Sequence, residues 1–322
     1  MNRYRFYRGI LVLFLVLIGL WMIQKEQDRR QESERYMVSV IVSDSNNDRW
    51  IAMKQGMEQA AGDFHIDLNI ISTGPFATLE EELEVVRREV SNNVDGVILQ
   101  MVSSEQAYEA LEGIFTKEAV IFLETDIEPE EYFVSVVPDN IGMGAALADC
   151  ILKDYGERIE GKKIGILGGN QKQISMQQRL SGFTKQMEGS NAEITWVLHS
   201  ESEEQIEKEE MLTLVDLLVA LDNAETEQAV DYLLEVPQEA KRCALYGEGI
   251  SEKVVYYLDR GLIQSLVVPN EFHMGYQSVK EMSRQLSYSP TIGESSQVGF
   301  LVVDKENLYK ADNQKILFPI VQ

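Results

Sequence analysis

The strongest constraint on the fold is a regular alternation of short apolar runs with longer amphipathic stretches. Residues 37–43 (MVSVIVS) are rich in β-branched and apolar side chains, which is typical of a strand buried on both faces. The next stretch, residues 48–63, places apolar side chains at helical spacing. Repetition of this unit predicts an α/β fold, in which parallel sheets carry helices on both faces.

The alternation occurs in two halves of the chain. In the first half we expect strands at residues 67–72, 94–102, 120–124 and 132–137, and helices at 79–90 and 104–115. The second half has expected helices at 141–155 and 176–187 and expected strands at 163–167, 192–199, 215–221 and 242–246. Gly56 and Gly182 occupy matching positions in the two halves. The chain of 322 residues is therefore predicted to form two similar lobes.

The N-terminal part is predicted to be a membrane anchor. Residues 9–23 (GILVLFLVLIGLWMI) carry no charge, and Trp21 lies near the end of the run, as aromatic side chains do at membrane interfaces. No cysteine precedes Cys150, so we expect no lipid anchor. The run ends without the small residues of a cleavage site, which favours an uncleaved anchor, with a cleaved signal or a buried helix as the alternatives. We interpret residues 1–24 as a cytoplasmic tail with one transmembrane helix, and residues 25–36 as a polar stalk. The protein would then cross the cell membrane once, with its bulk outside the cytoplasm.

Charge and motif content exclude several function classes. The chain has 29 basic and 53 acidic side chains and a net charge of −24, which repels phosphate backbones, so no nucleic-acid partner is expected. Its three histidines and two cysteines are scattered without metal-ligand spacing. Neither a phosphate-binding glycine motif nor a nucleophile-elbow motif occurs, so we predict no cofactor, no metal and no enzymatic activity. Cys150 and Cys243 are expected to be buried thiols, with a disulfide as the alternative.

Acidic side chains follow several predicted strands. Glu124, Asp222 and Glu248 all come at or just after the carboxyl end of a strand. A single carboxylate there is commonly a solvated loop residue. Because open α/β sheets bind ligands at the carboxyl ends of their strands, the three together predict a ligand cleft.

Several segments, taken in order, resemble the type 1 periplasmic binding proteins, the ribose-binding protein family. Residues 45–50 (SNNDRW) resemble the first strand-to-helix turn of that family, and residues 138–144 (PDNIGMG) resemble its hinge and the helix that follows. Residues 164–183 resemble the opening of its second lobe. Later landmarks match at residues 221–223, 247–249 and 267–275, so the resemblance covers residues 37–322.

The resemblance implies two Rossmann-like lobes, joined by a three-strand hinge, that close on a ligand. It places crossings near Asp139, Pro269 and Val302. The N-terminal lobe would comprise residues 37–139 and 270–302, and the C-terminal lobe residues 140–269 and 303–322. By position, the resemblance assigns ligand contacts to Asn47, Trp50, Gln100, Glu124, Asp139, Gln177, Asp222, Glu248 and Asn270.

Departures from the family pattern bear on the ligand. Arg49 stands where the family has a second aromatic before Trp50, and Glu124 begins a dipeptide that replaces an Asp-Arg pair. The arginine expected in the second lobe falls on Gln177, and we interpret Arg179 as structural. The pocket is thus predicted to be acidic and to lack both usual arginines, which argues against ribose. Another neutral sugar, a polyol or an amine-bearing ligand remains open, as does a degenerate receptor that binds none.

We therefore expect a membrane-anchored extracytoplasmic solute-binding protein, with a carbohydrate as its small-molecule ligand. It would serve an ABC-type permease or report to a membrane histidine kinase, and a permanent anchor favours the sensory role. The alternative is the effector domain of a repressor-like regulator, which shares this fold. Such a regulator would need a helix-turn-helix before residue 37, where the apolar segment stands.

Overall fold

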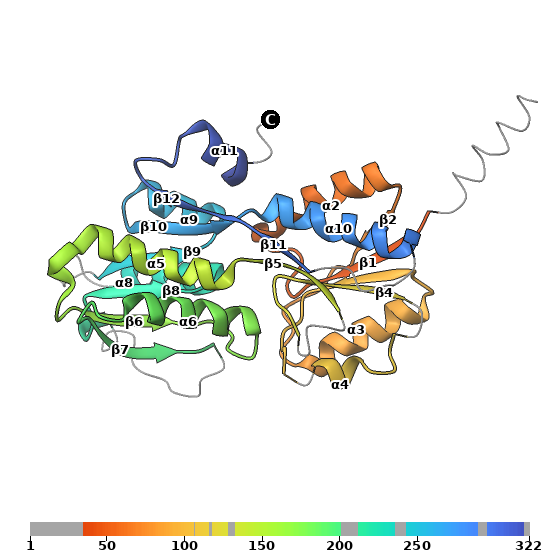
Figure 1. Cartoon of the computed structure of the whole chain (residues 1–322), viewed down its shortest axis with the longest axis horizontal. Coiled ribbons are helices and arrows are strands. Elements are labelled where there is room, and N and C mark those ends of the chain that lie inside the picture. Colours follow the sequence, from red (N-terminus) through yellow and green to blue (C-terminus); the bar gives the residue numbers. More distant parts are fainter. Residues whose placement is uncertain are drawn as a thin grey trace, which may run out of the picture.

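Two lobes, each built on one six-stranded sheet, make up the described part of the chain (Figure 1). The computed structural model describes residues 35–105, 107–115, 118–127, 133–200, 212–235, 243–288 and 295–318. The predicted α/β class and two-lobe architecture are confirmed. The predicted membrane helix and almost all of the polar stalk lie outside these residues, and no helix within them is long and apolar enough to cross a membrane.

The first lobe has the strand order β11-β5-β4-β3-β1-β2, with every neighbouring pair parallel. Its strands are β1 (Met37–Ile41), β2 (Asp67–Ile70), β3 (Gly96–Leu99), β4 (Ala119–Leu123), β5 (Val134–Pro138) and β11 (Ser296–Val298). Its helices are η1 (Asp48–Trp50), α2 (Ile51–Phe64), α3 (Leu79–Ser91), α4 (Ala107–Leu111) and α10 (Glu271–Tyr288). Strand β3 is buried along its whole length, as its apolar sequence predicts.

The second lobe has the order β12-β10-β9-β8-β6-β7 and one antiparallel pair, β10 with β12. Its strands are β6 (Lys163–Leu167), β7 (Glu193–Leu198), β8 (Leu217–Ala220), β9 (Ala244–Glu248), β10 (Ile263–Pro269) and β12 (Phe300–Asp304). Its helices are α5 (Asn140–Tyr155), η3 (Gly156–Ile159), α6 (Ile174–Met187), α8 (Asn223–Glu235), α9 (Glu252–Asp259) and α11 (Ala311–Leu317).

The two lobes repeat one plan, as the matching glycines predict. The first five strands of each lobe have the same order, β2-β1-β3-β4-β5 and β7-β6-β8-β9-β10. A Cβ on Gly56 of α2 would collide with the carbonyl oxygen of Phe272 in α10, and a Cβ on Gly182 of α6 would collide with that of Ile141 in α5. Each glycine therefore permits a close helix pair at the equivalent place in its lobe.

The chain passes between the lobes three times. The passages lie at Asp139, between β5 and α5; at Asn270, between β10 and α10; and at Gly299, between β11 and β12. The third precedes the predicted boundary at Val302, because β12 pairs with β10 in the second sheet. Strands β11 and β12 form one extended segment broken only at Gly299, so the sequence pattern contains no boundary there.

Both cysteines are buried free thiols, as predicted. Cys150 lies in α5 among apolar side chains, and Cys243 just precedes β9 in a separate core cluster. Both therefore belong to the second lobe, and neither takes part in a disulfide.

Candidate functional site

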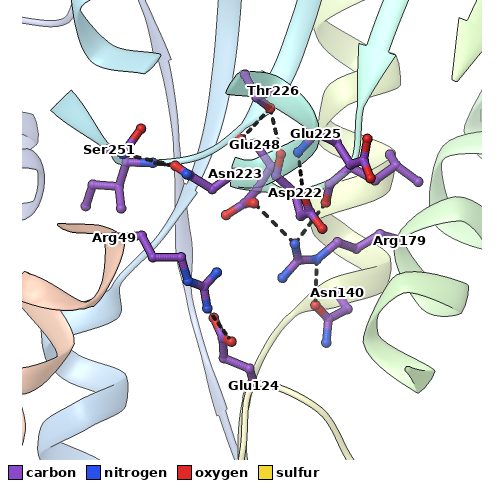
Figure 2. A network of polar contacts seen from close by, with 12 residues as sticks. Arg49, Glu124, Asn140, Arg179, Asp222, Asn223, Glu225, Thr226, Glu248 and Ser251 are labelled. Carbon is purple, nitrogen blue, oxygen red and sulfur yellow. Dashed lines mark hydrogen bonds and ion pairs between the residues drawn. The ribbon is translucent and has the colours of Figure 1, made fainter. Parts of the chain in front are cut away.

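Charged side chains gather between the lobes, at the carboxyl ends of the strands. Figure 2 shows the Arg49–Glu124 pair of the first lobe facing Arg179, Glu248 and Asp222 of the second. Glu124 follows β4, Asp222 follows β8, and Glu248 ends β9. This edge is where open α/β sheets bind ligands, so the cluster lies where the fold places a site.

On the first lobe, the turn after β1 positions Arg49. The side chain of Asn47 accepts a hydrogen bond from the Arg49 backbone N–H at 3.0 Å and starts η1. Arg49 Nη2 then lies 2.7 Å from Glu124 Oε2, and Gln100 Nε2 donates to the same oxygen at 3.0 Å. Glu124 has a φ of 63°, a left-handed conformation that costs a non-glycine residue about 1–3 kcal/mol. The local structure therefore holds this carboxylate in a strained position at the cleft.

Trp50 lies behind this ion pair. Its side chain is 3 % exposed and belongs to the core of the first lobe. The guanidinium carbon of Arg49 lies 3.9 Å from the centroid of the indole ring, which is a cation–π contact. A ligand can therefore reach the indole face only if Arg49 turns away.

On the second lobe, Arg179 of α6 organises the site. Its Nε donates to Asn140 Oδ1 at 2.9 Å, and its Nη1 donates to the Leu221 carbonyl oxygen at 2.9 Å. The same Nη1 lies 3.3 Å from Glu248 Oε2, and both side chains are about 95 % buried. Arg179 thereby joins the hinge helix α5, the end of β8 and the end of β9.

A further buried carboxylate belongs to Glu271, the first residue of α10 after the second passage between lobes. Glu271 is 3 % exposed, and its Oε2 has no hydrogen-bond partner. Burial raises its pKa well above the ordinary value, and the Glu124 carboxylate raises it further, against the opposing effect of Arg49 and Arg179. The sequence offered little sign of this residue, since a glutamate at the start of a helix is ordinarily solvated.

Burial has the same effect on Glu248. It raises the pKa of this carboxyl to about 7, although Arg179 lowers it, and nearby Asp222 adds to the rise. For Arg49, burial lowers the pKa, but the carboxylates of Glu124, Glu271 and Glu248 outweigh it and raise the pKa. The cluster is therefore electrostatically coupled across the two lobes.

A cavity of about 770 Å³ opens beside the cluster, with walls from both lobes. Asn47 and Arg49 line it from the first lobe, and Asn223 and Glu227 are among its lining residues from α8 of the second. The Asn223 side chain accepts hydrogen bonds from the backbone N–H groups of Ile250 and Ser251, both at 3.0 Å. These bonds fix the start of α8 to the loop before α9 on this side of the cavity. Of the charged cluster, Arg49 is the member that also lines this cavity, and most of the lining comes from α8.

Hydrogen bonds also join the lobes directly. Asn170 Nδ2 donates to the Val102 carbonyl at 2.7 Å, and Gln173 Nε2 donates to the Met101 carbonyl at 2.7 Å. The Ser175 backbone N–H donates to Thr125 Oγ1 at 3.3 Å. These contacts hold the two lobes together next to Glu124 and Arg179.

The structure brings some of the residues predicted from the resemblance into the cluster. Gln100, Glu124 and Glu248 lie within it, and Asp222 lies at its edge, where it also accepts a hydrogen bond from the Glu225 N–H at 2.8 Å. Asn47 lines the cavity.

The other predicted residues have different surroundings. Asp139 caps α5 by accepting a hydrogen bond from the Gly142 N–H at 2.9 Å, and Asn270 accepts one from the His273 N–H at 3.0 Å. Gln177 is exposed and donates to the Gln171 carbonyl at 2.7 Å. Asp139 and Asn270 thus lie at the first two passages, while Gln177 makes its hydrogen bond within the second lobe.

The positions of the family's two usual arginines hold other residues in this chain, but guanidinium groups still lie between the lobes. They belong to Arg49 and Arg179, which come from other positions than those that the resemblance suggested. Arg179 could have been found, because it interrupts the apolar stripe of Met176 and Phe183 on α6, and a charge at such a position needs a buried partner. Asn140, which orients Arg179, carried no comparable signal.

Comparison with known proteins agrees with this geometry. A family model described as a periplasmic binding protein domain matches residues 38–289. No curated protein matches the chain. Among solved structures, the chain is similar to GanP, a glucose-galactose binding protein from Geobacillus stearothermophilus, with 21 % identity and a TM-score of 0.73. That match covers 86 % of this chain and 100 % of GanP.

Two further structures share the fold. One is a carbohydrate transporter solute binding protein from Agrobacterium radiobacter in complex with D-arabinose, at 16 % identity and a TM-score of 0.74, covering 88 % of this chain and 99 % of that one. The other is XylFII in the XylFII-LytSN complex, at 19 % identity and a TM-score of 0.71, covering 85 % and 99 %. At these identities the likeness concerns the fold.

Proposed function

The chain belongs to the periplasmic binding protein domain family, and on that basis we propose that it binds a sugar-type ligand between its two lobes. The observation that carries this proposal is the polar cluster at the carboxyl ends of both sheets. Each lobe contributes one guanidinium and at least one carboxylate, namely Arg49 with Glu124 and Arg179 with Glu248. Ligand binding rather than catalysis is the role that we assign to these groups.

The chemistry of the cluster suits hydroxyl groups. Carboxylates accept hydrogen bonds from hydroxyls, while guanidinium and amide groups donate to them. Gln100 places an amide group beside Glu124, and Asn47 places another in the wall of the cavity. The indole of Trp50 would offer an apolar surface to a sugar ring once Arg49 has turned away from it.

We further propose that the protein is anchored in the cell membrane by residues 9–23, with the two lobes outside the cytoplasm. The absence of charge in this run supports the anchor. The partner would be a membrane histidine kinase or an ABC-type permease. The permanent anchor favours the kinase, and the structural neighbour in the XylFII-LytSN complex lends support to a protein partner for this fold.

Thermal unfolding of the detergent-solubilised full chain with a panel of neutral pentoses, hexoses and hexosamines tests ligand binding. A ligand that binds only the folded state raises the unfolding temperature, and the rise grows with the logarithm of its concentration above Kd. We expect at least one sugar to do so, and Arg179→Met to abolish that shift. A panel that leaves the unfolding temperature unchanged throughout contradicts the proposal.

Protease treatment of intact cells and of lysed cells tests the anchor. The full-length chain should stay in the membrane fraction, and the part from residue 37 onward should be cut in cells whose membrane is intact. A soluble mature form that begins near residue 25 would refute the anchor.

A further inference from the structure

The cleft contains more buried negative charge than positive charge. Arg49 and Arg179 face the carboxylates of Glu124, Glu248, Glu271 and Asp222, of which the three glutamates are buried. Each guanidinium is already committed, Arg49 to Glu124 at 2.7 Å and Arg179 to Glu248 at 3.3 Å. Glu271 is left without a cation of its own among the described residues.

Glu271 lies inside this cluster and not at its margin. Its carboxyl interacts electrostatically with Glu124 and Arg49 of its own lobe and with Glu248 and Arg179 of the other. The side chain is 3 % exposed, and Oε2 has no hydrogen-bond partner. Glu248 Oε2 likewise makes no hydrogen bond, only the ion pair with Arg179. Two buried carboxylate oxygens from opposite lobes thus make no hydrogen bond.

An unpaired buried carboxylate is costly unless it takes up a proton or gains a cation. Among the described residues, no group of three or more histidine, cysteine, aspartate or glutamate side chains is placed to hold a metal ion. These residues therefore give no sign of a metal at the two oxygens. A proton can neutralise each carboxyl, and a cationic ligand can take the place of that proton.

Building on the proposed sugar-type function, we propose that the cleft selects a ligand with an amino group on a polyhydroxyl frame, such as an amino sugar, and that its ammonium group binds Glu271 and Glu248. An ammonium group has three N–H donors and no acceptor, which suits two carboxylate oxygens that make no hydrogen bond. The hydroxyls of the frame would meet the amide of Gln100 beside Glu124 and the guanidinium groups of Arg49 and Arg179. Without such a ligand, these buried carboxyls would hold protons. An ammonium group can replace those protons with its own charge, whereas a neutral sugar cannot.

Calorimetry on the full chain tests this with matched pairs: D-glucosamine, D-galactosamine and D-mannosamine, each against its parent hexose. At about pH 6.5 a sugar amine is largely protonated, as a free α-amino group is. We expect one amino sugar to bind at least about tenfold more tightly than its parent. Glu271→Gln should remove that preference, whereas Glu58→Gln, at an exposed position of α2, should keep it.

A second measurement, the proton release on binding, uses the wild-type chain and does not depend on the Glu271→Gln variant. Because burial raises the pKa values of Glu271 and Glu248, an ammonium that pairs with them should drive protons off the carboxyls. The binding enthalpy should then differ between two buffers of different ionisation heat, with net proton release. An enthalpy independent of the buffer contradicts the proposal.

The outcomes separate the two proposals. A parent hexose that binds as tightly as its amino sugar, or more tightly, overturns the amino-group inference and leaves sugar binding intact. If neither set binds, both are overturned.

Discussion

At the scale of single residues, Arg179 supports the second-lobe half of the cleft. It is 4 % exposed and joins Asn140, the Leu221 carbonyl and Glu248. Arg179→Met keeps an unbranched apolar stem but leaves Glu248 buried without a counter-ion. Breaking a buried pair in this way costs about 3–5 kcal/mol. Urea unfolding near pH 8 should show a loss of this size.

The double variant Arg179→Met/Glu248→Gln is the control for that loss. Because glutamine carries no charge, it should recover part of the free energy of unfolding. A double variant as unstable as the sum of the single variants would mean that the pair is not coupled.

Glu271 should give the stability a distinct pH dependence. Its pKa is raised in the folded state, so its contribution is fully present below the unfolded pKa of about 4.3 and is lost as pH rises through the folded pKa. Glu271→Gln cannot ionise there. Between about pH 5 and about pH 8, its free energy of unfolding should therefore fall less than that of the wild type. If the free energy of unfolding of the wild type and of Glu271→Gln changed equally with pH, the pKa of Glu271 would not be raised in the folded state.

Sequence reasoning reached only part of the site at this scale. Glu124 and Glu248 could be predicted, because a carboxylate that follows a buried strand in an α/β sheet points to the binding edge. Glu271 and Asn140 could not, because their burial depends on how α10 and α5 return across the hinge. The role of Arg49 depends on the distant Glu124, which no local pattern records.

At the scale of elements, the close helix pairs should tolerate no side chain at their glycines. A Cβ on Gly182 of α6 would collide with the backbone of Ile141 in α5, which cannot give way as a flexible side chain can. Overpacking of this kind costs about 1–3 kcal/mol, so Gly182→Ala should be destabilising in urea unfolding.

Gly62→Ala is the matched control for that substitution. Gly62 is exposed on α2, and a Cβ there meets no atom within 4 Å. The variant should gain about 0.5–1 kcal/mol from helix propensity alone. If Gly182→Ala were as stabilising as Gly62→Ala, the packing of α5 on α6 would be described wrongly.

Of the three scales, the helices and strands were predicted best from the sequence. Strands such as β1 and β6 lie within or match the predicted runs, because their apolar side chains are buried on both faces. The third passage was predicted near Val302 but lies at Gly299. A single glycine separates β11 from β12, so the sequence shows no turn that would mark the change of lobe. Pairing partners, and not local pattern, decide to which sheet such a strand belongs.

At the scale of the whole molecule, the two lobes meet through three chain passages and a set of direct hydrogen bonds. The contacts of Asn170 and Gln173 with the first lobe hold the cleft in the arrangement of Figure 1. Such bonds are individually worth about 1 kcal/mol, so the lobes can separate without a ligand. A ligand that contacts both lobes favours the closed state by its difference in affinity for the two states.

The distance between the lobes, measured with and without ligand, tests this account most directly. Because Cys150 and Cys243 are buried, spin labels can be placed on the full chain at exposed positions away from the cavity, Gln59→Cys in α2 of the first lobe and Lys185→Cys in α6 of the second. The ligand should be the sugar or amino sugar that most raises the unfolding temperature. With it, pulsed electron paramagnetic resonance should show that the distribution of distances between the two labels narrows to a single, shorter distance. A distribution that stays unchanged at saturating ligand would contradict closure of the lobes on a ligand between them.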